Sequence, residues 1–270
     1  MVKENMKTVE EIYDRYAQDY SGDFAPTTFT TSHSAMSFAN DITWHFILKY
    51  IPKNKSIKIL DAGAGDGYWS EKLIKSGYKN IVLSDISQKM LDEAKKRLAK
   101  TKVSYVKADI ANMKEFAANS FDFIFSQFDP VSYCMKPAHA LKEMMRVAKK
   151  NAYIVASLDT KFRRVSELVE AGQIDKAKHL LKTNISYDFV HPQYNLTWEE
   201  LEEYAKKAKL QVIEIIGAPV FMHRVDEKVL EKLEQDKKIR KQLLKIELEN
   251  CTNKSLVNFA GHLQIVCKKR

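Results

Sequence analysis

The feature that most constrains this chain is an apolar run that ends in an acid and opens into a loop of three glycines. Ile59-Leu60 precedes Asp61, and Gly63, Gly65 and Gly67 follow at alternate positions. Glycine has no Cβ, so it accepts a positive φ and lets a ligand approach the backbone closely. The helix expected directly after the loop has unpaired amide groups at its start. The run therefore predicts a buried strand, a ligand-binding loop and a helix in succession.

Apolar strands and amphipathic helices alternate regularly from this point on. Strands are predicted at residues 57–60, 81–85, 103–106, 121–125, 153–158, 210–216 and 261–267. Helices are predicted at residues 69–76, 87–100 and 138–148. Strands that alternate with helices form crossover units, which give a parallel sheet with helices on both faces. The predicted fold class is α/β, a doubly wound and mostly parallel seven-stranded sheet.

A polar residue follows each of the first five predicted strands. These residues are Asp61, Asp85, Asp109, Gln127 and Asp159. The carboxyl ends of parallel strands meet at one edge of a sheet, and open α/β sheets bind their ligands there. We therefore expect these side chains to surround one binding site.

The spacing and charge of the glycine loop discriminate between two kinds of cofactor, dinucleotides and S-adenosylmethionine. A dinucleotide fingerprint places its third glycine three residues after the second, whereas Gly67 stands two residues after Gly65. Asp61 and Asp66 would repel a pyrophosphate, but they suit the ammonium and sulfonium groups of S-adenosylmethionine. The predicted cofactor is therefore S-adenosyl-L-methionine, with S-adenosyl-L-homocysteine as product.

The acids after the second and third strands fit the rest of that cofactor. Asp85 stands 20 residues beyond Gly65, where a carboxylate can accept both ribose hydroxyls. Asp109 can accept a hydrogen bond from the exocyclic amine of adenine, and Ile86 and Ile110 can form apolar walls for the ring.

Four segments resemble the successive motifs of class I S-adenosylmethionine-dependent methyltransferases. They are residues 61–67, Asp85, Ala108-Asp109-Ile110 and Phe121-Asp122-Phe123-Ile124, within residues 40–217. The resemblance implies a Rossmann-like fold in which the glycine loop holds the methionine part of the cofactor, Asp85 binds ribose and Asp109 reaches adenine. Gln127 joins Asp61, Gly63 and Gly65 among the predicted cofactor contacts.

The N-terminal region predicts a helical cap over residues 1–50. Residues 8–20 place Val9, Ile12, Tyr13, Tyr16 and Tyr20 on one face of a helix. Such a stripe packs against a core or covers a pocket. It is similar to the cofactor-covering segment of menaquinone and ubiquinone methyltransferases, which implies that Tyr13, Tyr16 or Tyr20 borders the cofactor or the substrate. Tyr16 and Tyr20 are the predicted cofactor contacts.

The segments outside the regular alternation of strands and helices have weaker periodicity. We expect loops or short helices at residues 21–40, a helix at 41–50, and a helical insertion at 160–196 that forms part of the substrate pocket. Residues 226–250 read as one long charged helix or a pair broken near Gln235. The chain has no internal repeat or low-complexity linker, so residues 1–270 are predicted to form a single domain.

Methyl transfer is an in-line displacement, so positioning and proton removal matter more than covalent catalysis. Asp159 could hold a cationic amine and accept its proton, and Tyr133 and His139 are further candidates for catalysis. The predicted substrate-binding residues are Phe24, His33 and Tyr187.

Two substrate classes stay open at this point. The first is a small molecule or peptidic natural product, methylated on nitrogen or oxygen in a closed pocket. The second is tRNA, because the C-terminal layout is similar to that of tRNA wobble-uridine carboxyl methyltransferases. The cations that could then contact phosphates are Lys161, Arg163, Arg164, Lys237, Lys238, Arg240 and Lys241. A cofactor-binding scaffold without turnover is a third reading, which the intact acids disfavour.

Composition bears on three further classes: membrane proteins, proteins that bind polyanions, and proteins held by disulfides or zinc. With 45% hydrophobic residues and no apolar run long enough to span a membrane, the chain reads as a soluble cytoplasmic protein. A formal charge of +9 fits polyanionic partners, but also an ordinary lysine-rich surface. Cys134, Cys251 and Cys267 are too scattered for a disulfide framework or a structural zinc site, and no metal is predicted.

Overall fold

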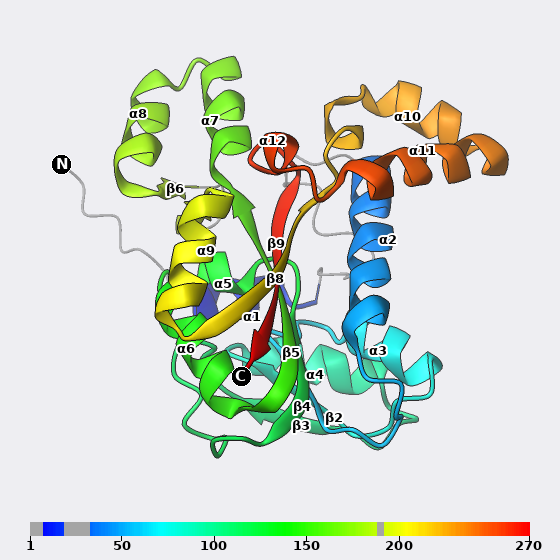
Figure 1. Cartoon of the computed structure of the whole chain (residues 1–270), viewed down its shortest axis with the longest axis vertical. Coiled ribbons are helices and arrows are strands. Elements are labelled where there is room, and N and C mark those ends of the chain that lie inside the picture. The colour runs from blue at the N-terminus through cyan, green and yellow to red at the C-terminus, as the bar shows by residue number, and fades with distance from the viewer. Residues whose placement is uncertain (1–7, 19–32, 188–191) are drawn as a thin grey trace.

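The computed structural model describes residues 8–18, 33–187 and 192–270. Five strands form the parallel part of its sheet, in the order β3 (Ser104–Lys107), β2 (Ile81–Asp85), β1 (Ile59–Ala62), β4 (Phe121–Ser126) and β5 (Ala148–Thr160). On the other edge of β5 lie β9 (His262–Lys269) and then β8 (Leu210–Ala218), both in antiparallel pairings (Figure 1). This is the predicted α/β architecture, with an antiparallel strand completing the sheet.

Within the described residues the sheet has nine strands, two more than predicted. The additional strands form a hairpin, β6 (Ile185–Tyr187) and β7 (Pro192–Leu196). β5 has 13 residues and β4 only 6, so β5 extends beyond its neighbour. Asp159 and Thr160 at the free end of β5 pair with β7 instead. The extra length of β5 thus explains why the insertion joins the sheet.

Helices cover both faces of the sheet. On one face α2 (His33–Tyr50), α3 (Tyr68–Lys75) and α4 (Gln88–Arg97) contribute to an apolar cluster with β1, β2 and β4. On the other face α5 (Pro130–Tyr133), α6 (Pro137–Val147) and α9 (Trp198–Lys207) pack against β4, β5 and β9. α9 begins at the predicted capping box, in which Thr197 and Glu200 satisfy each other's backbone amides.

The second helix is longer than predicted, because its N-terminal half is buried by elements from the far end of the sequence. α2 begins at His33 rather than at residue 41. Ala35 and Phe38 form a small core with Met222 and Leu230, which belong to the 3-10 helix η1 (Met222–Arg224) and to α10 (Glu227–Glu234). Tertiary contacts therefore stabilise the first half of α2 as a helix, although its sequence is rich in small and polar residues.

Two helical pairs project from the sheet. After β5 the chain forms α7 (Lys161–Glu170) and α8 (Ile174–Thr183), and after β8 it forms α10 and α11 (Lys237–Asn250), which stand apart in Figure 1. The break between α10 and α11 falls at Gln235–Asp236, where the Asp236 side chain caps the new helix. The short α12 (Lys254–Val257) leads into β9.

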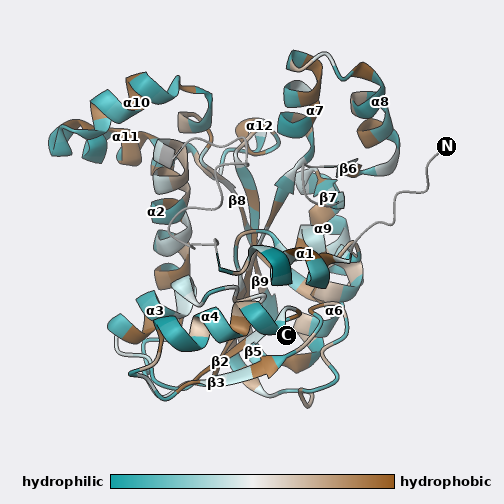
Figure 2. Cartoon of the chain, turned by 180° about the vertical axis from the view of Figure 1, so that it is seen from behind, coloured by the Kyte–Doolittle hydropathy of each residue, from teal (hydrophilic) through white to brown (hydrophobic). Residues whose placement is uncertain are grey.

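The N-terminal helix α1 (Val9–Tyr16) lies beside the start of α4. Figure 2 shows it in front of the strands, between α4 and α6. In the part of the chain that the structure describes, no helix combines the length and apolar character needed to cross a membrane.

Candidate active site

A cavity of about 360 Å³ lies where the parallel strands β1–β4 end. Its lining includes eight of the residues predicted for the site: Gly63, Gly65, Asp85, Ile86, Asp109, Ile110, Gln127 and Tyr133. Residues distant in sequence therefore meet at the carboxyl edge of the sheet, as expected for an open α/β fold.

The glycine loop is shaped by a close contact with Pro130 and by hydrogen bonds to the end of β2. Gly63 has φ +77°, and a Cβ at this position would lie 2.4 Å from the side chain of Pro130. Glycine is therefore required for the loop after β1 to pack against the start of α5. The amide of Gly65 donates to Asp85 Oδ2 at 2.9 Å, which ties the same loop to the end of β2.

Asp85 is 9% exposed and lies at the centre of the cavity's hydrogen bonding. Its Oδ2 accepts from Gly65 and its Oδ1 accepts from the Ser87 amide at 2.9 Å. A carboxylate oxygen can accept more than one hydrogen bond, so both oxygens retain capacity for a ligand. Burial raises the pKa of Asp85 to about 6. The energetic cost of this buried carboxylate would fall when ligand donors reach it.

The other two acids of the loop differ from expectation. Asp61 does not line the cavity; it is buried and accepts a hydrogen bond from Ser70 Oγ at 2.7 Å. Burial, with the nearby charges of Asp85 and Asp66, raises the pKa of Asp61 to about 8. Asp66 lines the cavity, but Arg97 of α4 lies 2.6 Å from its Oδ2. These two acids therefore repel a pyrophosphate less than the sequence predicted, because Asp61 lies outside the lining and Asp66 already has a cation as partner.

The far end of the cavity combines a carboxylate with apolar walls. Asp109 is half-buried, and its Oδ1 accepts from the Ala111 amide at 2.8 Å. Ile86 and Ile110 contribute apolar surface to the same lining. This is the arrangement that the sequence predicted for an adenine ring.

Helix α1 contributes Tyr13 to the cavity lining, one of the three tyrosines expected to border the cofactor or the substrate. Tyr13 lines the cavity and its ring lies 6.1 Å from that of Tyr133. Tyr16 is 37% exposed and does not line it. The register of α1 is fixed by Asp14 Oδ1, which accepts from Ser87 Oγ at 2.5 Å and from the Lys89 amide at 3.2 Å. A helix held through Asp14 turns Tyr13, rather than Tyr16, toward the cavity.

The remaining predicted residues fall in three places. Tyr20 and Phe24 lie outside the described residues. His33 is the first residue of α2, and its side chain is not described. His139 is exposed on α6 and Tyr187 is 47% exposed at the end of β6; neither lines the cavity. Their predicted roles stay predictions.

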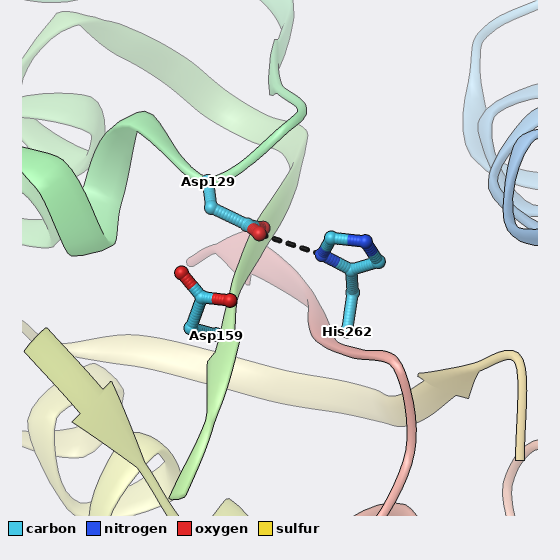
Figure 3. A group of neighbouring side chains, drawn as sticks. All are labelled: Asp129, Asp159 and His262. Carbon is cyan, nitrogen blue, oxygen red and sulfur yellow. Dashed lines mark hydrogen bonds and ion pairs between the residues drawn. The ribbon is translucent and has the colours of Figure 1, made fainter. Parts of the chain in front are cut away.

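A second group of polar side chains lies next to the cavity. Asp129 precedes α5, Asp159 is near the end of β5, and His262 begins β9 (Figure 3). His262 Nδ1 lies 2.6 Å from Asp129 Oδ2. Arg163 of α7 donates to Asp159 Oδ1 at 3.2 Å. The three side chains in Figure 3 converge from three separate segments, and we call them, together with Arg163, the acidic–histidine cluster.

The loop between β4 and α5 separates the cluster from the cavity. Gln127, Phe128 and Pro130 line the cavity, whereas Asp129 between them is fully buried and contacts His262. Phe128 and Asp129 have φ values of +62° and +67°. Two consecutive non-glycine residues in the left-handed region are strained, and such strain occurs preferentially at functional sites.

The charges of the cluster are interdependent. Burial disfavours protonated His262, but the Asp129 carboxylate outweighs this effect and the pKa of His262 is raised. Arg163 is similarly buried among carboxylates; its neighbours Glu167 and Asp159 oppose the cost of burial and keep its pKa raised. Both cations are therefore stabilised by acids rather than by solvent.

The cations proposed for phosphate contacts are divided between interior and surface. Lys161, Arg163 and Arg164 are each less than 10% exposed. They form intramolecular ion pairs with Glu200, Asp159 and Glu167. Arg240 pairs with Asp41 and Glu234, while Lys237, Lys238 and Lys241 are exposed on α11. The 161–164 group is therefore committed to contacts inside the protein.

His262 was not among the site residues predicted from the sequence. The signal lies in its strand, where His262 and Gln264 alternate with Leu263 and Ile265. In a strand buried on both faces, polar residues at alternate positions indicate one polar face.

Comparison with known proteins places the fold among methyltransferases. Residues 59–151 match the sequence model of a family described as a methyltransferase domain. No curated protein matches the sequence. Three solved structures illustrate the structural similarity.

A phosphoethanolamine N-methyltransferase 2 of Haemonchus contortus, in complex with S-adenosyl-L-methionine, has a TM-score of 0.65 and 18% identity, covering 98% of this chain and 60% of its own. A candidate methyltransferase of Haloferax volcanii, in complex with a methyltransferase activator, has a TM-score of 0.61 and 17% identity over 97% of each chain. A Thermotoga maritima protein, described as a possible histamine N-methyltransferase, has a TM-score of 0.58 and 17% identity over 97% of this chain and 99% of its own. The chain has the Rossmann-like fold of class I methyltransferases, and residues 59–151 match the model of a methyltransferase domain.

Proposed function

We propose that the chain is an S-adenosyl-L-methionine-dependent methyltransferase that methylates a nitrogen or oxygen of a small-molecule or peptidic acceptor. The observation that carries this proposal is the cavity after β1–β4, whose lining places Asp85, Asp109 and the glycine loop together. The match of residues 59–151 to a methyltransferase domain supports it. The single-domain organisation and cytoplasmic location expected from the sequence belong to the same proposal.

The residues present fit the proposed cofactor. Asp85 can accept the ribose hydroxyls, because each of its oxygens is already oriented by one backbone amide. Asp109 can accept from the adenine amine, and Gly65 in the cavity lining has no side chain to obstruct the methionine part. The bound cofactor supplies an electrophilic methyl group on its sulfonium; the protein positions the acceptor and removes its proton.

A small acceptor fits better than a polynucleotide. The acidic–histidine cluster beside the cavity is buried, so the reacting group has to enter the protein interior. Lys161, Arg163 and Arg164 are occupied by internal acids. Two structural neighbours, the phosphoethanolamine N-methyltransferase 2 and the possible histamine N-methyltransferase, are named for small amines, which supports this preference.

Calorimetric titration with S-adenosyl-L-methionine tests the cofactor site. Asp85→Ala should weaken binding by about 1–3 kcal/mol, or roughly 5- to 150-fold, through the loss of charge-assisted hydrogen bonds. The matched control is Asp92→Ala on α4, whose side chain is 50% exposed and pairs with Lys95. Equal affinity in the two variants would refute the proposed cofactor site.

Transfer of label from methyl-labelled cofactor tests the acceptor class. We expect label in a deproteinised small-molecule extract and none in total tRNA. Label that appears in tRNA, with a rate that falls steeply as salt rises, would replace the small acceptor with the nucleic acid.

A further inference from the structure

The ends of β5 and β9 carry a polar layer on the face that packs against α2. Val155 and Val266 belong to the apolar cluster on that face. Side chains in a strand alternate between faces, so Ser157 and Asp159 on β5, and Gln264 and His262 on β9, continue the same face toward the cofactor cavity. Gln264 Nε2 donates to Thr43 Oγ1 on α2 at 2.5 Å. The apolar face thus becomes polar where the methyl acceptor would have to bind.

This layer presents hydrogen-bond acceptors. Among the described residues, Gln127 Oε1, Asp129 Oδ1 and Gln264 Oε1 are buried side-chain oxygens without a hydrogen-bond partner. A buried polar atom without a partner is costly, and natural proteins satisfy most such atoms. A ligand that brings several N–H donors would satisfy this group.

The charge of the cluster favours a cation. Three carboxylates, Asp129, Asp159 and Glu167, face two guanidinium groups, Arg163 and Arg164. The group carries one net negative charge when His262 is neutral, which is the form that can accept a proton, and no net charge when His262 is protonated. A protonated amine would neutralise this negative charge, whereas a phosphate or carboxylate would add to it.

The two ring nitrogens of His262 differ in their hydrogen bonding: Nδ1 contacts Asp129, and Nε2 has no partner among the described residues. Nδ1 lies 2.6 Å from Asp129 Oδ2, so in the neutral ring it is the nitrogen that carries hydrogen. Nε2 is buried and has no partner among the described residues. Asp129 therefore fixes the tautomer in which Nε2 has a free lone pair, which is what a general base needs.

We propose that the acidic–histidine cluster is the acceptor subsite for the ammonium group of a small amine, with His262 as general base and Asp129 as its positioning residue. This inference rests on the proposed function. His262 Nε2 takes a proton from R–NH₃⁺, and the resulting nitrogen lone pair forms the N–CH₃ bond as the S–CH₃ bond breaks. The products are R–NH₂–CH₃⁺ and neutral S-adenosyl-L-homocysteine, and His262 releases its proton to solvent.

The same three side chains could be considered for a metal ion, since ligand atoms of Asp129, Asp159 and His262 lie within 4.8 Å of one another. Arg163 argues against this use, because its guanidinium already donates to Asp159 Oδ1. A guanidinium in this position supplies the positive charge that a divalent cation would otherwise provide. Metal binding is therefore one of the outcomes that would overturn the proposal.

Nitrogen-15 NMR of histidine-labelled protein tests the base without requiring an acceptor. His262→Asn identifies the His262 signals. We expect the neutral ring to carry hydrogen on Nδ1 and the pKa to exceed its ordinary value, with Asp129, Asp159 and Arg163 as the charged groups that face it. Asp129→Asn should lower this pKa. An Nε2–H tautomer, a pKa insensitive to Asp129→Asn, or selective broadening of the His262 signals by micromolar Mn²⁺ would overturn the proposal.

Methyl transfer to the small-molecule extract tests the amine. The label should be retained on a cation exchanger, be stable to alkali, and fall at least tenfold when the extract is first acetylated with acetic anhydride. His262→Asn should slow transfer by about 100-fold or more while binding the cofactor normally, and the exposed control His45→Asn should be unaffected. Asp129→Asn should shift the pH dependence of transfer to lower pH.

Label released by alkali as methanol, label unaffected by acetylation, or full activity of His262→Asn would contradict the inference. A complete lack of transfer in every arm, with normal cofactor binding, would instead remove support from the proposed methyltransferase activity. The NMR result would still decide whether the Asp129–His262 pair has the tautomer of a base.

Discussion

The two halves of the candidate site are built by different means. On the cofactor side, Asp85 is held by the backbone amides of Gly65 and Ser87, all within 22 residues of the chain. On the acceptor side, Asp129, Asp159 and His262 come from segments up to 133 residues apart and are held by side-chain charges. A local, backbone-based site leaves a sequence motif, whereas a side-chain cluster depends on how distant segments pack.

The largest effect should come from removing the central cation of the acceptor side. Arg163→Met leaves Asp159 without its buried cationic partner and Glu167 with Arg164 alone, and we expect a loss of about 3–5 kcal/mol in the free energy of unfolding. Urea denaturation measures this loss. The control Lys206→Met removes an exposed i,i+4 partner of Glu202 and should cost less than about 1 kcal/mol. Similar midpoints for the two variants would mean that the cluster is not an essential ion network.

A smaller effect should come from the contact that joins the two sides. Gly63→Ala places a methyl group 2.4 Å from Pro130 at a positive φ. We expect a loss of about 3 kcal/mol in unfolding free energy from overpacking and backbone strain, together with weaker cofactor binding by calorimetry.

Gly77→Ala separates these two causes. Gly77 also has a positive φ, of +93°, but an added Cβ would have nothing within 4 Å. This variant should lose about 1 kcal/mol, from backbone strain alone. If both alanine variants lose the same amount, the approach of Pro130 does not constrain the glycine loop.

The smallest effect should be a pH-dependent one on the cofactor side. Burial raises the pKa of Asp85 to about 6, so the folded state binds a proton more tightly than the unfolded state. Stability from this group is therefore present below about pH 4 and is lost as the pH rises to about 6. Asp85→Asn should remove that loss. The free energy of unfolding of the variant minus that of wild type should therefore be about 2 kcal/mol larger at pH 7 than at pH 4.

Urea denaturation of wild type and of Asp85→Asn between pH 4 and pH 7 measures this difference in the free energy of unfolding. His262 has a raised pKa too, so its contribution is complete below about pH 6.5 and falls as the pH rises through its folded value. The two sides should thus lose stability in separate windows, Asp85 first. A profile for Asp85→Asn parallel to that of wild type would show that this carboxylate is not perturbed.

Most of the fold could be predicted because its signals are periodic and local. The alternation of apolar strands with helices led to the parallel sheet, and Thr197 with Glu200 marked the start of α9. The first half of α2 could not be predicted in this way, because Ala35 and Phe38 are buried by η1 and α10. The β6–β7 hairpin was missed because it pairs with the part of β5 that extends beyond β4.

For the site, the sequence by itself determined the glycine loop, Asp85 and Asp109, because a strand end, a tight loop and a helix start are fixed by neighbouring residues. Only the tertiary structure decided that Tyr13 rather than Tyr16 lines the cavity, that Arg97 pairs with Asp66, and that His262 lies against Asp129. Those facts depend on helix register and on strands that meet across the whole chain. Side-chain pairing at such distances has no periodic signal in a single sequence, so it becomes visible only when the sheet is assembled.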